Sequence, residues 1–235
     1  KASGFEYDTA TGILTVTGNG LKLSGVGKNI MLYVKQSVSD ITFENLTLTA
    51  GDMNGVKPDD FSSSMGAGDG VGSADKYLMY VSSNSLKVSI NGNVTLSKRN
   101  TAVTENLFAI YQAHLDYDDV TPMSMEFIGG DSPNLTVTGN TYAIQSMGSV
   151  DFSNMTFTVA AEYYGVHAET IRFDRCSIIT TGLAGTNIES STGIYSNDLS
   201  IVDCSLDIRT GIFGETINIS GATDGTVTSG YGGAV

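Results

Sequence analysis

Side chains that could contact a ligand follow a small residue and a branched aliphatic residue at repeated places in the chain. Ala109-Ile110, Gly165-Val166 and Gly193-Ile194 are three such pairs. Along a β-strand the aliphatic residue would point inward, and the residues on both sides of it would point outward. The side chains that follow the pairs therefore form a predicted outward column of Lys57, Tyr111, Gln145, His167, Tyr195 and Phe213.

Flat rings beside small residues suit the apolar faces of sugars, and neighbouring Ser, Thr and Asn side chains offer hydrogen-bond partners. We therefore predict a carbohydrate-binding face that consists of Tyr111, Gln145, His167, Tyr195 and Phe213. In the alternative interpretation, the small residues ease packing between neighbouring segments, and the rings only cover adjacent side chains.

A cluster of charged residues follows His167 and consists of Glu169, Arg172, Asp174 and Arg175. Such a cluster could hold a sugar that bears a carboxylate, or it could supply a general base. The favoured alternative is a set of interlocked ion pairs on the surface.

Two acidic segments interrupt the periodic pattern and carry oxygen ligands of the kind that Ca²⁺ prefers. The candidate metal ligands are Asp59, Asp60, Asp116, Asp118 and Asp119. Neither segment has the spacing of a recognised calcium loop, and solvated acidic loops are the alternative. We therefore predict that the protein requires no cofactor and that Ca²⁺ is the ion these segments could hold.

Motifs that identify common enzymes are absent from the sequence. It contains no paired-histidine zinc motif, no Cys-x-x-Cys motif, no phosphate-binding glycine loop and no nucleophile elbow. The two histidines, His114 and His167, stand far apart in the chain. These motifs therefore propose no catalytic site.

The elements that would position these residues are short strands inside an eight-residue repeat. Its clearest copies are 171–178 and 199–206, with earlier copies at 41–48 and 150–157. Apolar residues occupy positions one, three, six and eight, so the alternation slips between two strands and the chain must turn there. The fifth position is mostly Asn, Asp or Gly, residues that tolerate a left-handed backbone, and it holds Asn45, Asn154, Arg175, Asp203 and Gly221.

Later copies begin at Val150, Ile171, Leu199 and Ile217, a spacing of roughly 20 to 30 residues that is typical of stacked repeats. Strands rather than helices fill each copy, because Thr, Ser, Asn, Val and Gly are abundant and no helical periodicity occurs. The sequence therefore predicts an all-β, single-stranded parallel β-helix, a β-solenoid, in one domain over residues 1–235. We expect an N-terminal cap at 1–29, irregular loops at 51–77 and 113–134, and a C-terminal tail at 223–235.

Two cysteines, Cys176 and Cys204, occupy position six of their copies, as do Leu46 and Met155. Stacking of these copies would bring the α-carbons of the cysteines to about 5 Å, within reach of a disulfide. Two free, buried thiols are favoured, because side chains stacked in parallel suit a disulfide poorly. The disulfide remains the alternative.

The chain is acidic, with 12 Lys and Arg residues, 25 Asp and Glu residues and a formal net charge of −13. Duplex nucleic acid and anionic membranes are therefore excluded as expected partners, and an acidic polysaccharide would be repelled unless a cation bridged the charges. No apolar run is long enough to predict membrane insertion of this segment. We expect a monomer.

The copies at 41–48 and 171–178 resemble the coils of right-handed parallel β-helix proteins, the pectin-lyase-like superfamily. The resemblance covers most of residues 30–220 and is strongest to bacterial secreted or surface-displayed proteins of the carbohydrate-binding or adhesin type. It implies a right-handed coil, an extracellular or cell-surface location, and a polysaccharide or a host or cell-wall glycan as the partner.

Catalytic members of this superfamily match the chain poorly. Of the polygalacturonase motifs, only the Asp-Asp pair has a counterpart, in Asp59-Asp60, and Gly165-Val-His167 departs from Gly-His-Gly. Asp174 with Arg172 or Arg175 is the local counterpart of the pectate-lyase site. The resemblance therefore favours a non-catalytic carbohydrate-binding or adhesion scaffold. A polysaccharide lyase or glycoside hydrolase acting on uronate polymers and a structural spacer of a surface protein remain the alternatives.

Overall fold

The computed structural model describes residues 4–50, 77–98, 108–114, 119–183 and 192–227, and all structural statements below concern these residues. Every regular element among them is a β-strand, and none is a helix. Nearly all strand pairs are parallel, which confirms an all-β fold consistent with a β-solenoid. Accordingly, the described part of the chain offers no helix that could cross a membrane.

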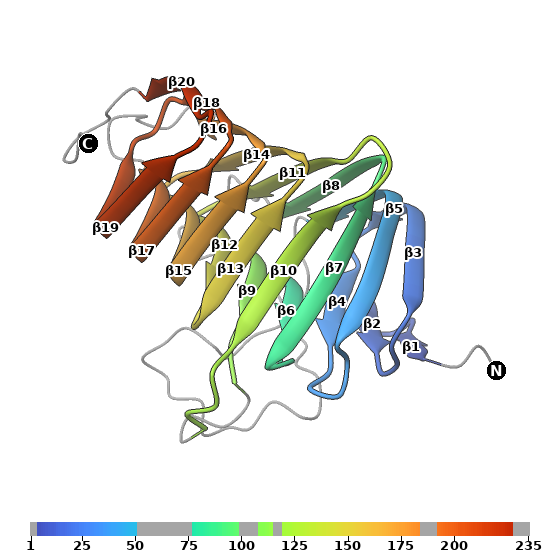
Figure 1. The fold of residues 1–235 in the computed structure, drawn as a ribbon. Helices are drawn as coiled ribbons and strands as arrows, with labels where there is room; N and C mark the ends of the chain where they lie inside the picture. The colour runs from blue at the N-terminus through green and yellow to red at the C-terminus, as the bar shows by residue number, and fades with distance from the viewer. Residues whose placement is uncertain (1–3, 51–76, 99–107, 115–118, 184–191, 228–235) are drawn as a thin grey trace.

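Parallel strands stack in three columns along the molecule, and most coils contribute one strand or half-strand to each column (Figure 1). The first column contains β3 (Leu21–Lys28), β5 (Asp40–Ala50), β7 (Ser85–Asn91), β10 (Ser124–Gly129), β13 (Ser149–Ser153), β15 (Tyr164–Asp174), β17 (Thr192–Val202) and β19 (Ile212–Ser220). The second column continues from the C-terminal halves of β3 and β5 through β8 (Asn93–Lys98), β11 (Asn134–Gly139), β14 (Thr156–Ala161), β16 (Ser177–Gly182), β18 (Ser205–Ile208) and β20 (Asp224–Val227).

The third column contains β2 (Ile13–Val16), β4 (Met31–Val34), β6 (Tyr77–Val81), β9 (Phe108–Gln112), β12 (Tyr142–Ser146) and the N-terminal halves of β15, β17 and β19. β1 (Phe5–Asp8) pairs antiparallel with β2 at the N-terminal end of this column. β1 therefore covers the outer edge of β2, and both strands lie within residues 1–29, where the sequence predicts an N-terminal cap.

The predicted repeat defines the stacking of the later coils. Val150 pairs with Ile171, Ile171 with Leu199, and Leu199 with Ile217. Inside the same coils, the ring of Phe152 stacks on that of Phe173 at 4.9 Å between centroids. Burying these matched apolar side chains against each other is the main source of cohesion between coils.

All five residues predicted at corners adopt a positive φ. The angles are 47° at Asn45, 56° at Asn154, 52° at Arg175, 52° at Asp203 and 71° at Gly221. The backbone turns there in the left-handed region, which Asn, Asp and Gly tolerate best. The corner prediction is therefore confirmed, including at Arg175, whose residue type did not favour it.

The first copy is displaced relative to the later ones. Ile41 pairs with Val88 in the row of Phe152, not in the row of Val150. Leu46 consequently lies beside Val94 instead of in the row of Met155, although it is buried as expected. The prediction that Leu46 stacks with the two cysteines is wrong, because neighbouring coils fix their register through the lengths of their corners as well as their apolar pattern.

Two expected boundaries differ from the structure. β10 lies inside the region 113–134 that was expected to be an irregular loop, and β20 lies inside the expected tail at 223–235. Both strands are short, and each pairs with a strand of the preceding coil: β10 with β7, and β20 with β18. The expected loop at 51–77 lies outside the described residues up to residue 76, and Tyr77 begins β6.

Candidate functional site

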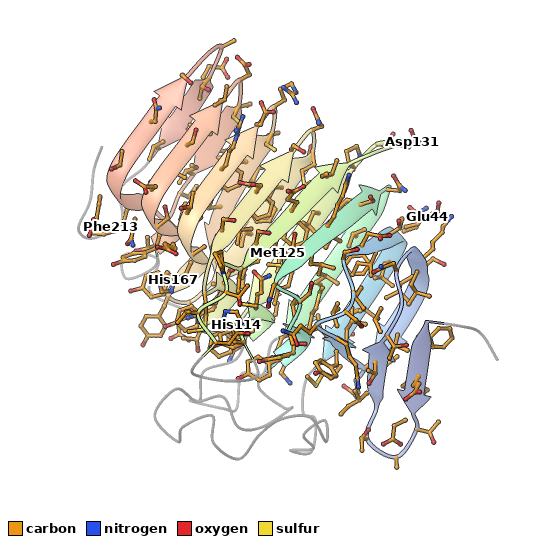
Figure 2. The ribbon with its side chains drawn as sticks, turned by 60° about the horizontal axis from the view of Figure 1, so that its bottom comes forward. Glu44, His114, Met125, Asp131, His167 and Phe213 are labelled. Atoms are coloured by element: carbon orange, nitrogen blue, oxygen red, sulfur yellow. The ribbon has the colours of Figure 1, made fainter. Side chains whose placement is uncertain are left out.

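The predicted ligand-binding residues lie in one row of the third column. Pairing connects Tyr111 to Gln145, Gln145 to His167, His167 to Tyr195, and Tyr195 to Phe213. Figure 2 shows His167 and Phe213 along one edge of the molecule, with Glu44 and Asp131 on the opposite edge. The shared row was therefore predicted correctly, while its role in binding stays a prediction.

The same row extends further toward the N-terminus through residues that the sequence analysis missed. Tyr33 pairs with Tyr80, and Tyr80 pairs with Tyr111. These residues follow Leu32 and Met79, so they lack the combination of small and β-branched residues that marked the later coils. Lys57, which was predicted for this row, lies outside the described residues.

A second row of rings lies beside the first. Its members, which precede the first-row residues by three positions, are Tyr77, Phe108, Tyr142 and Tyr164. Ring centroids are 5.0 Å apart between Phe108 and Tyr111, and 5.2 Å apart between Tyr164 and His167. Simple strand alternation does not predict this contact, because it places residues three apart on opposite sides of a strand.

The two rows form a continuous ribbon of aromatic rings whose exposure rises toward the C-terminal end. Tyr33, Tyr80 and Tyr111 are at most 5% exposed, whereas Phe213 is 41% exposed. We define the exposed aromatic face as the partly or fully exposed members of the ribbon, namely Tyr142, Tyr164, His167, Tyr195 and Phe213. Gln145 is partly exposed beside them. The prediction that Tyr111 points outward to a ligand is wrong, because the rings of Tyr77, Tyr80 and Phe108 pack around it and bury it.

Ring orientation changes within the exposed aromatic face. Tyr195 stands at 89° to His167, with a centroid distance of 4.9 Å, and stacks on Phe213 at 9° and 4.7 Å. Tyr142 and Tyr164 are stacked at 24°. Stacking hides much of the ring faces and leaves edges and hydroxyl groups toward a ligand, while Phe213 has Tyr195 as its one ring contact among the described residues.

The small residues next to the row do not form an exposed floor. Ala109, Ala143, Gly165 and Gly193 are all buried. A Cβ atom at Gly193 would lie 2.5 Å from Thr210 Oγ1 and 2.8 Å from Thr180 Oγ1. The expectation that these residues point outward is wrong, because they lie buried within β9, β12, β15 and β17, where neighbouring atoms leave no room for a larger side chain at Gly165 and Gly193.

His167 is neutral within the exposed aromatic face. Its Nδ1 atom is buried and has no hydrogen-bond partner. Burial lowers the pKa of this imidazole below its usual value, because the charged form loses hydration. His167 therefore acts as a polar aromatic ring at neutral pH.

The charged cluster predicted after His167 is split by the structure. Arg175 forms an ion pair with Asp174 at 2.8 Å, and its Nε donates to Asn154 Oδ1 at 2.8 Å. Arg172 lies in another row, next to Asp151. Glu169 is exposed near His167, at the border of the exposed aromatic face. The ion-pair interpretation describes the Asp174 end of β15, and Glu169 belongs to a different surface.

Carboxylates on adjacent coils also meet on the first column. Glu126 pairs in register with Asp151, and Asp151 pairs with Arg172. Burial raises the pKa of Asp151, the nearby charge of Glu126 raises it further, and Arg172 opposes both effects. Asp151 therefore holds a proton more readily than an ordinary surface aspartate.

Most of the predicted calcium ligands, namely Asp59, Asp60, Asp116 and Asp118, lie outside the described residues. Asp119 Oδ1 accepts a hydrogen bond from the Thr121 N–H at 2.9 Å, and its Oδ2 lies 3.3 Å from His114 Nδ1. Within the described ranges, no group of three or more His, Cys, Asp or Glu side chains is placed to hold a metal. Calcium binding stays a prediction.

Cys176 and Cys204 are free, buried and adjacent, as predicted. The Cys176 N–H donates to Cys204 Sγ at 3.3 Å. The hydrogen bond between the two thiols lowers the pKa of Cys204 to about 7 and raises that of Cys176. Of the pair, Cys204 therefore loses its proton first.

Comparison with known proteins gives no match for this chain, whether with family models, with curated protein sequences or with solved structures.

Proposed function

We propose that this protein is an extracellular or cell-surface scaffold that binds a polysaccharide without catalysing a reaction on it. The observation that carries the proposal is the exposed aromatic face, which five partly or fully exposed rings form along successive coils. Exposed aromatic residues are single and scattered on most protein surfaces, so a continuous row of them indicates contact with another molecule.

The spacing of the rings suits an elongated ligand. Neighbouring coils lie about 4.8 Å apart, so a polymer lying along the stack would meet a new ring at each coil. Ring edges and tyrosine hydroxyls supply both apolar contact and hydrogen bonds to sugar hydroxyls. We also propose that the coils wind right-handed, as crossovers between parallel strands nearly always do, and that the protein works as a monomer.

The test is a pull-down with insoluble polysaccharides together with a glycan array. The Tyr195→Ala, Phe213→Ala double variant should bind its best ligand about 5- to 150-fold more weakly, since each ring contributes roughly 0.5–1.5 kcal/mol. Phe5 and Tyr7 on β1 are 37% and 48% exposed, so a Phe5→Ala, Tyr7→Ala variant is the matched control.

Loss of binding in the Tyr195, Phe213 variant but not in the control would support the proposal. Equal binding by both variants would remove this face from consideration. Absence of any glycan ligand for the wild-type protein would favour the structural spacer instead.

A glycoside hydrolase is a second candidate, favoured by Glu126 and Asp151. Register partners on adjacent coils lie about 5 Å apart, close to the spacing of the two carboxyl groups in retaining enzymes. The raised pKa of Asp151 suits a proton donor. New reducing ends released from a polysaccharide panel by the wild type, but not by Asp151→Asn, would establish this activity, and unsaturated products would indicate a lyase.

A further inference from the structure

Carboxylates border the exposed aromatic face. Glu169 and Glu215 are exposed, and each lies two residues after a ring of the face, His167 and Phe213 respectively. Asn197 occupies the equivalent place after Tyr195, and the exposed Asp198 follows it. Side chains two residues apart on a strand lie on the same side, which places Glu169 beside His167 and Glu215 beside Phe213.

Positive charge is missing from the same surface. The described segments that build it, 142–147, 162–169, 192–198 and 212–216, contain no Lys or Arg. Arg209, which lies shortly before β19, is engaged by Asp207 through two contacts at 2.7 Å and 3.0 Å. Since His167 is neutral, every charged side chain in these described segments is a carboxylate.

We propose that the exposed aromatic face binds a polysaccharide that carries free amino groups, an amino-sugar polymer without full N-acetylation. The inference rests on the proposed function and names the ligand class for that same face. Ammonium groups are attracted to carboxylates, and they donate hydrogen bonds to hydroxyl oxygens such as those of Tyr142, Tyr164 and Tyr195, which ring stacking leaves toward a ligand. Uronate polymers would meet unopposed negative charge and be repelled.

Charge complementarity also separates this ligand class from neutral glycans. A neutral polymer gains nothing from Glu169 and Glu215 beyond single hydrogen bonds, and it must displace their bound water. An ammonium group on the sugar ring would instead form ion pairs with these carboxylates and so replace the water that the ligand displaces. In such a ligand, the sugar rings would contact the aromatic side chains, and the amino groups would contact the carboxylates.

The experiment compares polymers that share one backbone. Binding of the wild-type protein is measured to polyglucosamine, to its fully N-acetylated form and to polygalacturonate, each at low and high salt. We expect polyglucosamine to bind at least about tenfold more tightly than the acetylated polymer, with the difference shrinking as salt rises. Polygalacturonate should not bind.

The matched variants remove equal charge from two surfaces. A Glu169→Gln, Glu215→Gln variant should bind polyglucosamine about tenfold more weakly and leave binding of the acetylated polymer unchanged. A Glu44→Gln, Asp131→Asn variant changes the opposite edge of the molecule (Figure 2) and should bind like the wild type. Equal losses in the two variants would overturn the inference, because they would reflect net charge alone.

Three further outcomes decide between the inference and the proposed function. If the acetylated and free polymers bind equally, and both depend on Tyr195 and Phe213, the glycan-binding function stands and the amino-sugar inference fails. If no polymer binds the wild type, both fail. Binding of polylysine as tightly as polyglucosamine, without dependence on Tyr195 and Phe213, would overturn the inference in favour of unspecific attraction.

Discussion

At the scale of single residues, the corners show how little sequence is needed to turn each coil. Asn154, Arg175, Asp203 and Gly221 occupy successive left-handed corners, although only three of them are of types that favour this conformation. Arg175 is held there by contacts to Asp174 and Asn154, which are surface interactions of modest strength. The stacked neighbours thus impose the conformation on a residue that would not choose it.

Burial of His167 in the aromatic ribbon should make the stability of the folded protein depend on pH. Its pKa is lowered in the folded protein, so below about pH 6.5 the unfolded chain binds a proton that the folded chain resists. Stability should therefore fall as the pH drops through this range. His167→Phe should remove that part of the loss, as measured by urea midpoints near pH 5 and pH 7.5.

The wild type and the His167→Phe variant contain the same carboxylates. The difference between their losses of stability from pH 7.5 to pH 5 therefore reports the contribution of His167 alone. A larger loss in His167→Phe than in the wild type would contradict the burial of the imidazole. The same variant keeps an aromatic ring in the row, so stacking is conserved while the titrating group is lost.

At the scale of elements, a glycine inside β17 sets how closely the third column approaches its neighbours. A Cβ at Gly193 would collide with Thr180 and Thr210, whose hydroxyls share a hydrogen bond of 2.7 Å. Gly193→Ala should therefore cost about 1–3 kcal/mol, as overpacking does in well-filled interiors. Denaturant unfolding followed by circular dichroism measures the change.

Gly214→Ala serves as the comparison for this variant. A Cβ there would meet Ile217 Cγ1 at 3.0 Å and Thr216 O at 3.3 Å, distances that a small shift can relieve. It should lose clearly less stability than Gly193→Ala. Equal losses would show that the clash at Gly193 is not what limits this corner.

The elements also show how far sequence reasoning reaches. Rows such as Val150, Ile171 and Leu199 were predictable, because identical spacing in each copy fixes which residues stack. The contact of Tyr142 and Tyr164 with the first row was not, since alternation places residues three apart on opposite sides of a strand. Register between distant coils, as for Ile41, depends on corner lengths that the local pattern does not specify.

At the scale of the whole molecule, the two ends of the stack differ. β1 pairs with the edge of β2 at the N-terminal end. At the other end, β19 pairs only with β17 among the described strands, and Ile219 and Val227 are 40% and 38% exposed. Each inner coil is supported on both sides, so stability should decrease toward the C-terminal coil.

Amide hydrogen exchange should therefore be fastest in β19 and β20 and slowest in β10 and β13, which have paired strands on both sides. The amides of a stacked repeat open through fraying of the end coil at a lower free energy than through global unfolding.

Ile219→Asn should consequently lower the free energy of unfolding by less than about 1 kcal/mol. Ile201→Asn, one coil further in and fully buried, should cost several times more, because it places an unpaired amide in the core. Uniform protection along the stack, or equal losses in the two variants, would mean that the last coil is covered as well as the inner ones.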